Sequence, residues 1–264
     1  MTIGLGTYAY FWRLSDRVSN PLSLPEAIAH AAASGVELFQ ICDYAPLETM
    51  TDTELAAVRA AAVDHQVTLE LGTKGIQTPH LRRFLHIADI LDARLLRTMF
   101  NTAEHRPDVP EATALLRAIL PELVDHGVTL ALETYEQVPT RDLVQVVRDI
   151  GHPRIGICSD PANTVAALEL PAAVVDAVAP YVVNMHIKDF AFSRRDGWVG
   201  FTFSGTPLGE GLLDYDHMVQ AIRPQTRDIN QIVEHWLPWQ GTEEETLRLE
   251  DQWTRQSLEF LRSK

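Results

Sequence analysis

Cysteine, basic residues and long hydrophobic runs are all scarce in this sequence, and each shortage excludes a class of protein. The two cysteines, Cys42 and Cys158, lie in apolar strand-like stretches. This placement is typical of reduced core thiols, although the sequence alone leaves a bridge between the two open. No apolar run reaches the roughly 18 residues that span a bilayer, and the first residues lack the basic and apolar segments of a secretory signal. We therefore expect a cytoplasmic protein with no membrane partner.

Basic residues are outnumbered, with 22 Lys and Arg against 36 Asp and Glu, and the formal net charge is −14. Such a charge repels phosphate backbones, so we expect no nucleic-acid partner and look for a small molecule instead. Hydrophobic residues make up 46% of the chain, and glycine and proline are spread along it without a linker-like segment. We expect one domain that spans residues 1–264.

Short runs rich in isoleucine, valine and leucine recur eight times along the chain. They begin at residues 3, 36, 67, 94, 128, 154, 181 and 230. The segments between them have helical periodicity, and Gly35 and Gly127 stand where helices give way to strands. Three of these segments open with start signals: Ser23 with Glu26, Thr51 with Glu54, and Thr78 followed by Pro79.

The alternation of eight strands with helices predicts an α/β fold, a single (β/α)8 TIM barrel with parallel strands inside and helices outside. The rival architecture, an open doubly wound sheet, is typical of chains with the fingerprint G-x-G-x-x-G after the first strand. The first strand here reads GLGTYA, which does not match that fingerprint. In a closed barrel the functional side chains lie at the carboxyl ends of the strands, so polar residues there are the candidates.

Four consecutive strands end in side chains that can bind a metal. These are Glu133, Asp160, His186 and Glu234. Carboxylates that converge in a cavity repel one another unless a cation lies among them. The sequence therefore predicts one divalent metal. Oxygen-rich ligation with a single imidazole favours Mn²⁺ or Mg²⁺, and Co²⁺ or Zn²⁺ could substitute.

With this quartet and the phrases HIKD and LGEGLLDY, the chain resembles over essentially its full length the xylose isomerase-like barrels, a group of sugar-phosphate isomerases and epimerases. The resemblance implies that all four side chains bind one metal and that Glu133 and Glu234 are also catalytic. It implies a hydroxy-carbonyl sugar or sugar acid as substrate and a metal-stabilised enediolate. The two glutamates could then take a proton on one face and return one on the other. We favour an isomerase or epimerase of carbohydrate metabolism.

One position departs from the pattern of the ketose 3-epimerases. Asn163 stands where they have a histidine, three residues after the aspartate of the quartet. The alternative activity, a metal-dependent decarboxylase of a 3-oxo sugar acid of the 3-oxo-isoapionate type, fits this departure because it removes no alpha proton. The apurinic endonucleases share the fold, but their three-metal site needs additional histidines that this chain lacks, and the net charge also disfavours DNA.

Further side chains are candidates for substrate binding. Lys188 could hold a substrate oxygen, or it could pair with Asp189 at the rim of the barrel. Arg194 and Arg195 lie in a long loop, 188–213, and could anchor a carboxylate or phosphate. The remaining candidates are Asn163, Trp12 and Trp236. Many aromatic residues follow the first, seventh and eighth strands, which indicates either a dry, lidded pocket or a subunit interface of a homo-oligomer.

Overall fold

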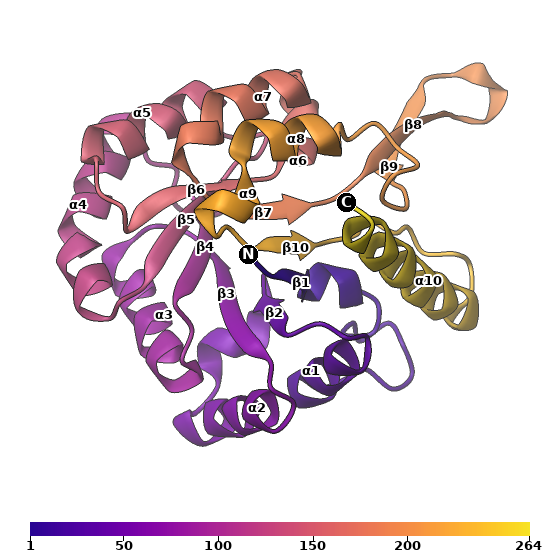
Figure 1. Ribbon diagram of the computed structural model, residues 1–264, viewed down its shortest axis with the longest axis horizontal. Helices are drawn as coiled ribbons and strands as arrows, with labels where there is room; N and C mark the ends of the chain where they lie inside the picture. The colour runs from indigo at the N-terminus through magenta and orange to yellow at the C-terminus, as the bar shows by residue number, and fades with distance from the viewer.

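The computed structural model describes residues 1–264, and eight parallel strands form a closed barrel inside a ring of helices (Figure 1). Around the barrel the strands follow the order β1-β10-β7-β6-β5-β4-β3-β2. Their bounds are β1 Ile3–Gly6, β2 Leu38–Ile41, β3 Thr68–Lys74, β4 Leu95–Met99, β5 Thr129–Glu133, β6 Ile155–Ser159, β7 Val182–Ile187 and β10 Gln231–Val233. Each of the eight predicted runs overlaps one of these strands, which confirms the predicted (β/α)8 TIM barrel.

The helices cover the outside of the barrel. Their bounds are α1 Leu24–Ala33, α2 Asp52–Asp64, α3 Thr78–Leu91, α4 Val109–Asp125, α5 Thr140–Ile150, α6 Pro161–Thr164, α7 Pro171–Val178, α8 Tyr215–Ile222, α9 Pro224–Arg227 and α10 Glu243–Arg262. Short 3-10 helices lie at Thr7–Tyr10, Ala45–Thr49, Val165–Ala167, Ala179–Tyr181 and Asp196–Trp198. No helix combines the length and the apolar character that crossing a bilayer requires.

Helix boundaries follow local rules that the sequence predicts. The two predicted capping boxes, Ser23 with Glu26 and Thr51 with Glu54, are both complete. The start of α3 is shifted by one residue from the prediction, because Gln77 is the N-cap and Thr78 is already helical. Pro79 is tolerated in the first turn, where an N–H has no intrahelical partner to lose. Gly35 and Gly127 adopt positive φ angles of 75° and 67° after α1 and α4, as helix-ending glycines do.

The first and last strands close the barrel. In this parallel pair Ile3 lies opposite Gln231 and Leu5 lies opposite Val233. On its other side β10 pairs with β7, where Ile232 lies opposite His186. Strand β10, which closes the barrel, therefore lies beside the strand that carries His186 and ends one residue before Glu234.

The interior of the barrel is unusually polar for this fold, in which branched aliphatic side chains usually fill the centre. Four polar side chains of the strands are buried there and bond to one another or to the quartet, namely Gln40, Glu70, Arg97 and Asn184. Cys42 and Cys158 are also buried, and both are free thiols, as the sequence predicts. A side chain at Gly72 would overlap the sulfur of Cys42, so glycine is required at that position. The apolar core lies instead between the strands and the helices.

The loop 188–213 contains an antiparallel hairpin that the sequence analysis did not predict. Its strands, β8 Phe190–Arg194 and β9 Phe201–Gly205, project beyond the ring of helices (Figure 1). The side chains of Phe192, Trp198, Val199 and Phe201 are exposed on it. The aromatic character of this end of the barrel is therefore partly exposed, and the subunit interface stays a prediction.

Helix α10 buries a carboxylate whose charge is expected to make stability depend on pH. Glu250 accepts hydrogen bonds from the backbone nitrogens of Trp12 at 2.8 Å and Arg13 at 3.3 Å. Burial raises the pKa of Glu250 from its ordinary value of 4.5 to about 7. A folded-state pKa above the unfolded value means that this group favours folding below the unfolded pKa and loses that contribution as the pH rises through the folded pKa.

We predict that Glu250→Gln flattens the dependence of stability on pH. Between pH 5 and 8 the wild type should lose about 2 kcal/mol of unfolding free energy relative to the variant, since one pKa unit corresponds to about 1.4 kcal/mol. Urea unfolding of both proteins across this range measures the effect. Subtracting the two profiles cancels the contributions of all other titrating groups. Parallel profiles would contradict the prediction.

Candidate metal centre and active site

The four predicted metal ligands converge at the carboxyl end of the barrel. Glu133 is the last residue of β5, Asp160 follows β6, His186 lies in β7 and Glu234 follows β10. One ligand atom from each of these buried side chains lies within 4.8 Å of the others. The structure thus brings together the complete quartet, from strands that are neighbours around the barrel.

The quartet has the properties of a cation site. Nδ1 of His186 lies 3.2 Å from Oε1 of Glu133, 3.4 Å from Oε1 of Glu234 and 3.7 Å from Oδ2 of Asp160. Oε1 of Glu234 is buried and accepts no hydrogen bond. A buried carboxylate oxygen without a donor is costly, and a cation would supply the missing partner. Three carboxylates and one imidazole form a donor set that suits a divalent metal.

Lys188 lies inside the cluster. Its ammonium is buried, 2.7 Å from Oδ2 of Asp160 and 3.0 Å from Oε2 of Glu234, and it stands 4.4 Å from the ring centre of Trp236. Burial acts to raise the pKa of Asp160, but the charges of Lys188 and His186 bring it well below its usual range. Lys188 and Trp236, two of the predicted substrate-binding residues, therefore lie at the quartet.

The alternative in which Lys188 pairs with Asp189 is wrong. The Asp189 carboxylate instead accepts four backbone hydrogen bonds, from the nitrogens of Phe190, Gly209, Gly211 and Leu213 at 2.8 to 2.9 Å. These bonds fasten both ends of the segment that carries the hairpin. Lys188 and Asp189, which directly follow β7, therefore have separate sets of partners.

Arg97 is a second buried cation at the site, and the sequence analysis missed it. Its guanidinium forms an ion pair with Oε2 of Glu133 and donates to Oδ1 of Asp43 at 3.1 Å and to the carbonyl of Thr73 at 3.0 Å. A signal was present, because an arginine at the centre of the run RLLRTM must face either the barrel interior or the helices. Asn163 also reaches the quartet, with Nδ2 3.0 Å from Oε1 of Glu133.

A pocket of about 440 Å³ opens beside these groups, between the segments that follow β1 and β2. Among the side chains that line it are Tyr8, Phe11, Cys42 and Asp43. Cys42 also lies within 4.8 Å of ligand atoms of His186 and Glu234, so the pocket reaches down to the quartet. Tyr8 and Phe11, two of the aromatic residues that follow the first strand, therefore line a pocket at the site, and a lid over it stays a prediction.

Trp12, Arg194 and Arg195 are not brought to the quartet. Trp12 donates from Nε1 to the carbonyl of Leu237 at 2.8 Å and packs edge-on against Trp239. Both arginines are exposed on the hairpin, where the guanidinium of Arg194 covers aromatic rings of the same hairpin. Their role in substrate binding stays a prediction, and in this geometry Arg97 and Lys188 are the cations next to the site.

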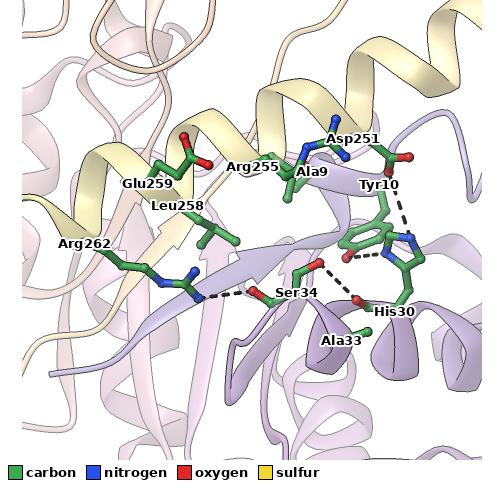
Figure 2. A pocket seen from close by; sticks show the side chains of 11 residues that line it. Ala9, Tyr10, His30, Ala33, Ser34, Asp251, Arg255, Leu258, Glu259 and Arg262 are labelled. Atoms are coloured by element: carbon green, nitrogen blue, oxygen red, sulfur yellow. Dashed lines mark hydrogen bonds and ion pairs between the residues drawn. The ribbon is translucent and has the colours of Figure 1, made fainter.

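A separate pocket of about 390 Å³ lies between α1 and α10 (Figure 2). Several of its polar groups have partners within the chain: Tyr10 pairs with His30 at 3.1 Å, and Arg262 donates to the carbonyl of Ser34 at 3.2 Å. None of its lining residues belongs to the quartet. It is a seam where the last helix packs against the first, and these contacts help to hold α10 in the ring.

The fold and the quartet together define a class of barrel enzyme. The model of the family described as xylose isomerase-like TIM barrel matches residues 27–264. The chain belongs to this family, as the sequence resemblance implied. It is also 58% identical over 261 residues to the 3-oxo-isoapionate decarboxylase of Pectobacterium atrosepticum, which covers 99% of this chain and 95% of the relative.

Solved structures with similar folds are more distant in sequence. A D-psicose 3-epimerase in the presence of D-fructose matches with a TM-score of 0.73 and 16% identity, over 99% of this chain and 98% of that one. A xylose isomerase-like TIM barrel protein from Mycobacterium smegmatis in complex with magnesium matches with a TM-score of 0.70 and 16% identity, over 97% of each chain. Such low identity shows the shared fold alone. The decarboxylase alternative is therefore better supported than the isomerase or epimerase activity that the sequence analysis favoured.

Proposed function

We propose that this protein is a divalent-metal-dependent decarboxylase of a 3-oxo sugar acid of the 3-oxo-isoapionate type. The relative at 58% identity supports the substrate class. The observation in the site that carries the proposal is that both glutamates of the quartet are tied to buried cations. Oε2 of Glu133 is paired with Arg97, and Oε2 of Glu234 is paired with Lys188.

This pairing disfavours proton shuttling between carbon and the glutamates. An isomerase or epimerase needs a carboxylate oxygen that can take a proton from carbon and a group that can return one. In Glu133 and Glu234 one oxygen lies beside His186 within the quartet, and the other is held by a cation. Once the quartet holds a metal, the oxygen beside His186 would be occupied as well, and neither glutamate would keep a free oxygen for a substrate.

Decarboxylation needs no carboxylate that takes a proton from carbon. The bond between the carboxylate carbon and the alpha carbon breaks, CO₂ leaves, and the bonding electrons move through the alpha carbon to the 3-oxo group as an enolate. The alpha carbon then takes up one proton from solvent, which restores the ketone. A divalent metal, when bound by the quartet, supplies positive charge that stabilises the enolate oxygen. Lys188, held by Asp160 and Glu234, adds a second positive charge at the same place.

The proposal predicts that CO₂ is released in proportion to substrate consumed. The purified protein with Mn²⁺ is incubated in D₂O with a 3-oxo sugar acid that carries ¹³C in its carboxyl group. We expect labelled CO₂ or bicarbonate in stoichiometric amount, and deuterium only at the carbon that lost the carboxyl group. Treatment with a chelator should stop the release. Turnover of ketoses, with deuterium exchange and no CO₂, would overturn the proposal in favour of an isomerase or epimerase.

A further inference from the structure

A buried network of amides and one carboxylate lies below the quartet, on the barrel axis. Gln40 of β2, Glu70 of β3 and Asn184 of β7 are all buried there. Oε2 of Glu70 accepts from Gln40 at 3.0 Å and from Asn184 at 3.1 Å, and Oε1 accepts from Asn230 at 2.8 Å. Every partner of Glu70 is thus an amide that donates to it.

Glu70 fixes the orientation of the Gln40 amide. Nε2 of Gln40 faces Oε2 of Glu70 at 3.0 Å and Oδ1 of Asn184 at 3.1 Å, so both of its hydrogens are used. The rotated amide would direct Oε1 of Gln40 at the Glu70 carboxylate, where two acceptors repel each other. Oε1 of Gln40 must therefore point the other way, towards His186.

The amide orientation in turn decides which nitrogen of His186 carries the proton. Nε2 of His186 lies 2.8 Å from Oε1 of Gln40, an atom that can only accept. Nε2 must then be the donor, and in a neutral imidazole the lone pair is left on Nδ1. Nδ1 is the nitrogen that faces the three carboxylates of the quartet.

We propose that Gln40 and Glu70 are positioning residues, which hold His186 in the tautomer and ring orientation that present Nδ1 as a metal ligand. The inference rests on the proposed metal site, and it assigns roles to two strand residues outside the quartet. Removal of a group that hydrogen-bonds to the second nitrogen of a metal-binding histidine typically weakens metal affinity by about 10- to 100-fold. A purely structural role for Gln40 would instead change stability and leave metal affinity unaltered.

The test measures Mn²⁺ affinity of the full chain by calorimetric titration, in the wild type and in two variants. Gln40→Met keeps the length of the side chain but removes the acceptor, and we expect binding that is about 10- to 100-fold weaker. The double variant Gln40→Glu with Glu70→Gln exchanges the two groups. The exchange again places an acceptor oxygen opposite Nε2 of His186 and an amide donor between positions 40 and 70. We therefore expect Mn²⁺ affinity within a few-fold of the wild type.

A second measurement is made on the wild type alone. In the ¹⁵N spectrum of the protein loaded with Zn²⁺, His186 should show a protonated Nε2 and a metal-bound Nδ1, and it is assigned as the histidine whose ring signals shift on addition of one equivalent of Zn²⁺. Zn²⁺ on Nε2, or unchanged Mn²⁺ affinity in folded Gln40→Met, would overturn the inference. A wild type that binds no metal would overturn both this inference and the proposed metal site. A protein that binds metal but releases no CO₂ would contradict the proposed reaction alone.

Discussion

Asp160→Asn should abolish metal binding and lower decarboxylation by roughly 1,000-fold or more. The change preserves the shape of the side chain but removes a charge from the quartet, where Oδ2 lies 3.7 Å from Nδ1 of His186. A metal supplies several kcal/mol of charge stabilisation to such a reaction, and each 1.4 kcal/mol corresponds to a factor of ten in rate. The charge of Lys188, 2.7 Å away, would also lose one of its two partners.

Metal analysis after dialysis and thermal unfolding with and without Mn²⁺ check this prediction. The wild type should hold about one metal per chain and melt at a higher temperature with Mn²⁺, since a ligand that binds only the folded state stabilises it. The variant should show neither effect. Asp149→Asn, the same substitution at an exposed position at the end of α5, is the matched control and should behave as the wild type. Equal metal content in Asp160→Asn would contradict the ligand assignment.

Arg97→Met should destabilise the fold by about 3 to 5 kcal/mol at neutral pH. The substitution leaves the buried carboxylate of Glu133 without its cation, and breaking a buried ion pair on one side typically costs this amount. Asp43 and the carbonyl of Thr73 also lose a donor. A buried Glu133 without a cation favours the protonated form, so the loss of stability should grow as the pH rises.

Urea unfolding of the metal-free protein at pH 5 and pH 8 measures the effect of Arg97→Met. The metal-free form is used because a bound cation would compensate for the missing guanidinium. Arg94→Met is the matched control, because Arg94 precedes the same strand but is exposed and pairs with the exposed Asp92. A loss no larger than that of the control would show that Arg97 does not neutralise Glu133.

The sequence predicts the barrel and the quartet for one shared reason, which is that both depend on position along a strand. Hydrophobic runs define the strands, and strand ends in a closed barrel face one mouth, so Glu133 and Glu234 can be placed together although 100 other residues separate them. Lys188 could be placed at the same mouth. Its partner could not, because the choice between Asp160 and Asp189 depends on backbone donors of a distant loop.

The network below the quartet illustrates what periodicity alone leaves undecided. Gln40, Glu70 and Arg97 each interrupt an apolar strand, and alternation places them on one face without saying whether that face is the interior or the helix side. The hairpin was missed for a different reason. Its alternating aromatics, FAFSR and FTFSG around Gly197 and Gly200, are a hairpin signal, but the expectation of eight strands left no place for two more.

The pairing of β1 with β10 has a consequence for how the chain reaches its folded state. Ile3 can meet Gln231 only after nearly the whole chain is available, and contacts so distant in sequence are formed slowly. Glu234 lies just beyond this closing strand. The quartet therefore becomes complete only when the barrel closes. During synthesis on the ribosome, a nascent chain that lacks its final strand has three of the four side chains of the quartet and an open sheet edge, so binding of the metal by all four side chains would mark closure of the barrel.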